Sequence, residues 1–332
     1  MTAYPPIDAQ RLERLFSGVS MRAFRHWLKL KGKKYSSANK EELIELVLNL
    51  IKEGEISERE FYEAWIGFEE NGAKRIMLFN SRVAFTDPEE FREHLQRLDL
   101  PLPSSPKLAP KRPEKPVLCY INWQETENGP RIQAKYAETH RDIVANKETR
   151  TFEEELRTVI VLIIQDVPNG LVQLKFDKLG DVHDHKGENG RSNKKQFIND
   201  YLTKAGQLLA EDNFRKLDLG GVMEWLSQSA NQGLFRLPRE EVRTSYNTRL
   251  SFNSMNPSAD IRMDPTHIAS TEADRENWIF EKLQGYWMPD LDRKYLQREL
   301  FMGINRSESK VWFAASCMPE EIEYAIRQIT KA

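Results

Sequence analysis

The chain has 332 residues, 39% hydrophobic and 30% charged, so it is long enough to bury the cores of two globular domains. Its net charge of −2 excludes a general attraction of the whole molecule to nucleic acid or membrane and leaves only local segregation of charge. The two cysteines, Cys119 and Cys317, are too few for a disulfide framework or a zinc cluster.

The first residues, MTAYPPIDAQ, lack the basic and apolar regions of a secretory signal. No apolar run reaches the ~18 residues that a membrane span needs. Both cysteines lie in apolar, strand-like runs, which is typical of buried reduced thiols in a reducing compartment. We therefore expect a protein that is cytoplasmic or associated with chromatin or a nucleoid, that is not secreted, and that has no membrane partner.

The first hundred residues carry a helical pattern. Apolar residues at helical spacing predict helices at 9–16, 21–30, 40–52, 57–70 and 88–98. Ser57 and Glu60 have the spacing of a capping box, and Pro88 suits the first turn of the last of these helices. The apolar run at 73–79 fits either a helix turn or a strand. These patterns predict a helical N-terminal domain over residues 1–97.

Residues 98–116, LDLPLPSSPKLAPKRPEKP, contain six prolines. Each proline ring removes a backbone donor and restricts φ, which is incompatible with a helix interior or a central strand. We expect an extended, semi-rigid linker that separates the helical domain from the rest of the chain.

The pattern changes after the linker. Alternating residues at 117–123 and 131–137, with Asn128-Gly129 between them, predict a hairpin. The run at 151–165 has apolar residues at the spacing of a one-sided helix, and 171–176 is a predicted strand. Further helices are expected at 197–210, 214–228, 271–283 and 318–329, strands at 295–304 and 310–315, and an exposed loop at 180–195. Residues 235–262 are ambiguous. The fold class is therefore α+β, with a mixed domain over residues 117–332.

Charge is segregated within the helical domain. Seven basic residues and no acidic residue lie between positions 22 and 40, interleaved with His26 and Tyr35. Such a surface fits phosphate contacts, whereas a merely solvated basic face is the alternative. The candidate nucleic-acid-binding residues are Arg22, Arg25, Lys29, Lys31, Lys33, Lys34 and Lys40.

The same stretch resembles the SAP helix–loop–helix module. The segments FRHWLKLKG, KYSSANK and EELIELVLNLI match its basic apolar first helix, Gly turn, polar loop and second helix. The resemblance covers about thirty-five residues and implies DNA binding through the first helix and the loop, although the loop is longer and more polar than usual. The matching positions are Phe24, Trp27, Leu28, Gly32, Lys40, Leu43, Ile44 and Leu48.

The order of elements along the whole chain is similar to that of the kinetochore family of centromere protein N. A helical module precedes a hairpin, a helix and a strand, and the chain closes with VWFAASCMPEEIEYAIRQI. The resemblance implies a helical head that meets DNA and the nucleosome, and a C-terminal part that pairs with a partner protein. Residues 190–265 have no counterpart, and no functional residue is transferred.

Two constellations point to an enzyme instead. Asp166 followed by Gln173-x-Lys175 has the residue order of restriction-like nucleases, in which carboxylates hold a metal and a lysine steadies the attack. His183 and His185 lie in a loop with Asp181, Asp184 and Glu188, a donor set that suits a divalent metal, although a solvated loop is the simpler interpretation. The sequence contains no GxGxxG, GKS/T, GxSxG or HExxH motif.

The prediction from the sequence is a non-enzymatic, DNA-binding subunit. We expect its helical head to contact the phosphate backbone without sequence specificity, and its α+β body to dock a partner protein or a second copy. No metal, cofactor or catalytic residue is expected. The alternatives are a metal-dependent nuclease and a protein-interaction scaffold whose basic face meets an acidic partner.

Overall fold

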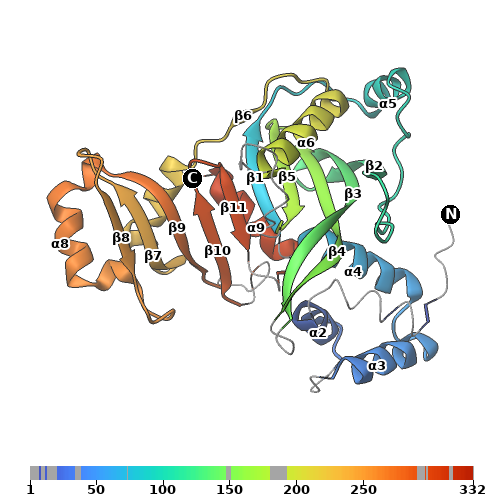
Figure 1. Cartoon of the computed structure of the whole chain (residues 1–332), viewed down its shortest axis with the longest axis horizontal. Coiled ribbons are helices and arrows are strands. Elements are labelled where there is room, and N and C mark those ends of the chain that lie inside the picture. Colours follow the sequence, from blue (N-terminus) through green and yellow to red (C-terminus); the bar gives the residue numbers. More distant parts are fainter. Residues whose placement is uncertain are drawn as a thin grey trace.

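The computed structural model describes residues 7–8, 12, 21–33, 39–72, 74–146, 151–179, 193–289, 296, 298–313 and 317–331. Within them, the strands form one antiparallel sheet in the order β2-β3-β4-β5-β1-β11-β10-β9-β7-β8, and β6 pairs with β1 (Figure 1). The strands are β1 (Lys74–Asn80), β2 (Val117–Thr126), β3 (Gly129–Asn146), β4 (Thr151–Asp166), β5 (Leu171–Asp177), β6 (Arg215–Lys216), β7 (Phe235–Arg243), β8 (Arg249–Asn253), β9 (Ile279–Trp287), β10 (Leu300–Asn305) and β11 (Lys310–Phe313).

The helices confirm the predicted α+β fold class. They are α2 (Met21–Leu30), α3 (Lys40–Lys52), α4 (Glu58–Asn71), α5 (Pro88–Arg97), α6 (Asn193–Leu209), α7 (Gly220–Leu226), α8 (Pro265–Asp274) and α9 (Pro319–Lys331). The capping box at α4 is present, because Ser57 and Glu60 bond each other's backbone N–H groups. None of the helices in the described part of the chain has the length and apolar composition needed to cross a bilayer.

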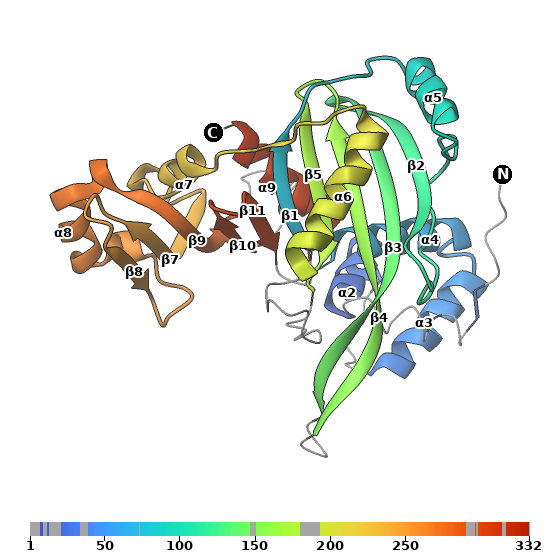
Figure 2. The ribbon, with the colours of Figure 1, turned by 45° about the horizontal axis from the view of Figure 1, so that its top comes forward.

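The helix predicted at 151–165 is wrong, because this segment is strand β4. Val161 and Ile163 face the core under α5 and α6, and the alternation of a strand turns Leu162 and Ile164 to the opposite face, where they are also buried. A strand buried on both faces reads as a continuous apolar run, and part of that run has helical spacing by chance. β4 pairs with β3 along its whole length, and the two strands extend beyond the sheet as a ribbon (Figure 2).

Two other predicted helices are only partly correct. The segment at 271–283 contains the end of α8, but its second half belongs to strand β9. The segment at 214–228 contains the two-residue strand β6 before the short helix α7. The ambiguous region 235–262 holds strands β7 and β8. The strand predicted at 295–304 is confirmed only from residue 300, as β10, while β11 and α9 confirm the closing strand and the C-terminal helix.

Three hydrophobic clusters hold the fold together. Helix α6 covers one face of β3, β4 and β5, and α5 lies at the edge beside β2; Phe91, Leu95 and Tyr201 are buried in the resulting core (Figure 2). Helices α7 and α9 close a second core around Trp287 on the C-terminal strands. A third core joins α2, α3 and α4, and it also contains Met318, immediately before α9. The helical layer is therefore packed against the C-terminal end of the chain.

The run at 73–79, which fitted either a helix turn or a strand, contains β1. This strand lies between β5 and β11, so residues before the proline-rich segment share a sheet with residues after it. The full register of β1 with β5 runs from Lys74 opposite Asp177 to Asn80 opposite Leu171. A division of the chain at residue 98 therefore passes through one hydrogen-bonded sheet.

The proline-rich segment contains no helix or strand, bends at 111–112 and 114–115, and is attached to the sheet and to α4. The backbone N–H of Ser104 donates to the carbonyl of Ile121 at 2.7 Å, and that of Ala109 donates to a carboxylate oxygen of Glu69 at 3.1 Å. The carbonyl of Pro113 accepts from the Thr139 hydroxyl at 2.7 Å. The segment thus follows the sheet surface as a half-exposed strap instead of standing clear of it.

Candidate functional site

Helix α2 separates its apolar and basic residues onto different faces. Phe24, Trp27 and Leu28 are buried, and the Phe24 ring packs against Phe61 of α4 with 5.7 Å between centroids. Lys29, at the end of the helix, is exposed. The apolar face therefore anchors α2 to the helical core and leaves part of its basic face in solvent.

We call the seven predicted contact residues the basic surface; the six of them that the structure describes occupy α2, the residues just after it and the start of α3. Arg22, Arg25 and Lys29 belong to α2, Lys31 and Lys33 follow it, and Lys40 is the first residue of α3. Lys34 lies outside the described residues, as does the side chain of Arg22. The structure thus confirms the two predicted helices, which carry four of these residues.

Two lysines of the basic surface already have acidic partners. Lys31 Nζ lies 3.0 Å from Glu60 Oε1, and Lys33 forms an ion pair with Glu55. Hydrogen bonds from the Ser57 backbone and from Lys31 lower the pKa of Glu60 to about 2, so its carboxylate is charged at neutral pH. Lys29 and Lys40 form no ion pair with a described residue. Part of the positive charge is thus neutralised within the molecule.

His26, also on α2, lies near Arg298 and Glu321 in the C-terminal part of the chain. Burial lowers the pKa of His26, and the positive charges of Arg298 and Lys29 lower it further, against the opposing effect of Glu321. Arg298 itself pairs with Glu321 on α9, with 2.8 Å between Nε and Oε1. His26 is therefore mainly neutral at pH 7 and adds little to the basic surface.

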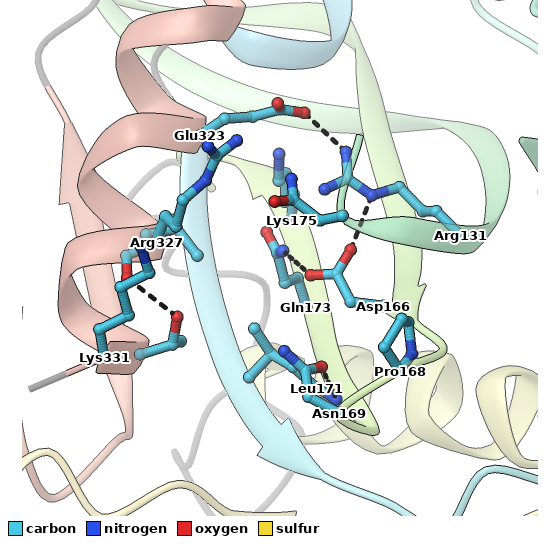
Figure 3. Close-up of a pocket in the computed structure, with 13 residues that line it drawn as sticks. Arg131, Asp166, Pro168, Asn169, Leu171, Gln173, Lys175, Glu323, Arg327 and Lys331 are labelled. Atoms are coloured by element: carbon cyan, nitrogen blue, oxygen red, sulfur yellow. Dashed lines mark hydrogen bonds and ion pairs between the residues drawn. The ribbon is translucent and has the colours of Figure 1, made fainter. Parts of the chain in front are cut away.

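A second site is a polar pocket between the sheet and α9, drawn in Figure 3. Its volume is about 210 Å³. Arg131 comes from β3, Asp166 from the end of β4, and Gln173 and Lys175 from β5. These side chains share a face because β3, β4 and β5 are adjacent and residues two apart point the same way. Helix α9 closes the pocket with Glu323, Arg327 and Lys331.

Arg131 links the two acidic side chains of the pocket. Its Nε donates to Asp166 Oδ1 at 2.7 Å, and its Nη1 donates to Glu323 Oε1 at 2.6 Å. Burial opposes the charge of Arg131, but the two carboxylates outweigh burial and raise its pKa. Because Arg131 is on β3 and Glu323 is on α9, these bonds hold the helix against the sheet.

Lys175 is buried with little compensation. It is 4% exposed, and the partner of its amino group is Asn71 Oδ1 at the long distance of 3.4 Å. Burial lowers the pKa of Lys175 to about 8. Next to it, Gln173 Nε2 donates to Asp166 Oδ2 at 3.3 Å, while Gln173 Oε1 is buried without a hydrogen-bond partner. The pocket thus contains an under-bonded ammonium group and an orphaned acceptor.

The residues of the nuclease alternative lie close together, but they do not form a set of donors that could bind a metal. Asp166, Gln173 and Lys175 do meet, yet both oxygens of Asp166 accept hydrogen bonds from Arg131 and Gln173. Across the described ranges, no three His, Cys, Asp or Glu side chains are grouped so that they could hold an ion. A nuclease of this type needs a second carboxylate where Gln173 stands. The loop of His183 and His185 lies outside the described residues.

The sequence indicated Asp166, Gln173 and Lys175 but missed the other walls of the pocket. Arg131 carries a weak signal, because in an alternating strand it falls on the same side as Gln133 and Lys135. Nothing in the sequence indicates that Glu323, Arg327 and Lys331 of α9 lie opposite, since that placement depends on the path of the whole chain.

A scan against protein-family models gives no match for this chain, and neither does a search of curated proteins. The resemblances to the SAP module and to the centromere protein N family therefore stay predictions.

Proposed function

We propose that this protein binds the phosphate backbone of DNA through the basic surface on α2 and the start of α3, without catalysing a reaction on it. One observation carries the proposal. Helix α2 buries Phe24, Trp27 and Leu28, while Lys29 and Lys31, which belong to the same acid-free stretch of sequence, are exposed. Phosphate contacts need only cations at a surface, with no further catalytic geometry. The α+β body would then dock a protein partner or a second copy.

The scaffold alternative rests on a specific contact. Lys31 and Lys33 bind the carboxylates of Glu60 and Glu55 within the molecule, so the same surface could bind acidic side chains of a partner. The two functions are separated by direct measurement of duplex binding with the purified chain. A surface for an acidic protein gives no measurable affinity for a short duplex at low salt.

Binding to duplex DNA should weaken linearly on a plot of log affinity against log salt concentration. Replacing Lys31, Lys33 and Lys34 together by Ala should reduce the slope by up to about three, because each lost phosphate contact removes roughly 0.9 from it. The loss should be similar on all sequences, since phosphate contacts do not read bases. Fluorescence anisotropy at several salt concentrations measures the slope.

The control for this variant is the double replacement of Lys194 and Lys195 in α6 by Ala. It also removes positive charge but should leave the slope within about one of the parent value. If the triple lysine variant binds duplex DNA like the parent, the basic surface is not the DNA contact.

Removing the internal carboxylates should strengthen binding. The double variant Glu55→Gln and Glu60→Gln releases Lys31 and Lys33 for phosphates, and Gln at position 60 keeps the capping-box geometry of α4. Exposed ion pairs are weak, so we expect an increase in duplex affinity of up to roughly five-fold per pair at low salt. The matched control is Glu63→Gln, whose carboxylate pairs with Arg59 instead of the basic surface. Equal affinities for the parent and the double variant would show that these lysines do not meet the phosphates.

A further inference from the structure

The polar pocket holds more positive charge than its own acids neutralise. Four basic side chains and two acidic ones line it, which leaves an excess of two positive charges when all are ionised. Both acids are already engaged by Arg131, through Asp166 Oδ1 and Glu323 Oε1. Among the described residues, no carboxylate forms an ion pair with Lys175, which is 4% exposed. A buried ammonium in this position is costly unless an anion accompanies it.

The pocket contains both donor groups and an acceptor group that lack hydrogen-bond partners among the described residues. Lys175 offers three N–H donors and uses one in a long contact with Asn71. Gln173 Oε1 is a buried acceptor without a partner. Most buried polar atoms in folded proteins have a partner, so such orphans call for an explanation. A ligand that accepts from Lys175 and donates to Gln173 completes both.

We propose that this pocket binds a small phosphate monoester, with the phosphoryl oxygens on Lys175 and Lys331 and a hydroxyl group of the ligand on Gln173. A monoester dianion matches the excess of two positive charges, because phosphate esters carry about −1.5 to −2 at pH 7. The volume of about 210 Å³ is below the roughly 300 Å³ at which drug-sized sites begin, so it admits a small molecule or the terminal phosphate of a longer one.

The arrangement assigns a separate role to each element. Lys175 supplies a desolvated charge at the base of the pocket, where an electrostatic interaction is stronger than in water. Lys331 supplies an exposed charge in the last turn of α9. Arg131 keeps α9 against the sheet through Glu323, so it positions the wall without needing to contact the ligand. Bound phosphate would keep Lys175 protonated, so affinity should fall as pH rises above about 8.

The test is calorimetric titration of the full chain with glycerol 3-phosphate, inorganic phosphate and succinate at low salt. Both phosphate probes should bind with one site, and succinate should bind at least ten-fold more weakly. Lys175→Met should weaken phosphate binding by at least ten-fold, and Lys331→Ala by about three- to ten-fold. The matched control is Lys52→Ala, an exposed lysine in the last turn of α3 that should bind like the parent.

Lys331→Ala keeps the test valid if Lys175→Met alters the pocket, because Lys331 is exposed and contributes nothing to the core. Duplexes with 5′-phosphate and 5′-hydroxyl ends identify the source of the phosphate. If the parent prefers 5′-phosphate duplexes and Lys331→Ala loses this preference, the pocket binds a nucleic-acid terminus. If glycerol 3-phosphate binds but duplexes show no 5′-phosphate preference, the pocket binds a free metabolite. Three results would each overturn the proposal. The first is that neither phosphate probe binds and duplexes show no 5′-phosphate preference. The second is that succinate binds more tightly than the phosphate probes, and the third is that both pocket variants bind phosphate like the parent.

This inference is independent of the proposed DNA contact. The pocket variants should leave the salt slope for duplexes with 5′-hydroxyl ends unchanged, and the lysine variants of the basic surface should leave the binding of glycerol 3-phosphate unchanged. Each proposal can therefore fail while the other stands.

Discussion

Replacing Val161 with Asp should lower the free energy of unfolding by roughly 3–5 kcal/mol, because it places an uncompensated carboxylate in the core beneath α6. Ile160→Asp should cost a similar amount, since Ile160 is buried on the opposite face of β4. Comparing the two variants is informative because in a one-sided helix Val161 would lie outside the buried apolar face, so only Ile160→Asp would be severe. Chemical denaturation of the two variants measures both costs.

The control is Leu156→Asp on the same strand. Leu156 is 42% exposed, so its replacement should change the free energy of unfolding by about 0.5 kcal/mol or less. A severe effect of Ile160→Asp combined with a mild effect of Val161→Asp would restore the helical interpretation of this segment.

Lys175→Met should stabilise the protein at pH 7 by up to about 3 kcal/mol in the absence of phosphate. The pKa of Lys175 is lowered from 10.5 to about 8, and each unit of difference between the folded and unfolded states corresponds to about 1.4 kcal/mol. Methionine has a similar length and no charge to desolvate. Denaturant unfolding of parent and variant in a phosphate-free buffer gives the difference.

The pH dependence of that difference has a defined sign. Below pH 8 the lysine is protonated in both states, so the full cost of burying its charge is present. Between about pH 8 and 10.5 the unfolded chain binds more protons than the folded chain, so the stability of the parent rises with pH. The advantage of Lys175→Met should therefore shrink across this interval. A difference that stays constant from pH 7 to 10.5 would show that Lys175 does not carry the buried charge.

Lys135 provides the opposite case on β3, which β4 separates from the strand of Lys175. It is also buried, but Glu69 and Glu70 outweigh burial and raise its pKa. Lys135→Met should destabilise the protein by roughly 3–5 kcal/mol, because it leaves two carboxylates at the sheet surface without their cation. The contrast between two buried lysines separates the effect of burial from the effect of pairing.

Local sequence signals determined α3, α4 and α5 and their N-terminal ends. Ser57 with Glu60, Asp87 before Pro88, and the apolar spacing of α3 depend only on residues within one or two turns of each other, and each is present in the structure. The same holds for α9. The charge segregation between positions 22 and 40 is also a property of the sequence alone.

Tertiary structure decided the identity of β4, the place of β1 and the composition of the pocket. The run VIVLII suits a helix or a strand equally well, and only the layers on both of its faces select the strand. β1 joins β5 and β11, which are about 100 and 230 residues away in sequence, through hydrogen bonds that no local pattern encodes. The pocket joins Arg131 to Glu323 across 192 positions, so its charge balance exists only once α9 has packed on the sheet.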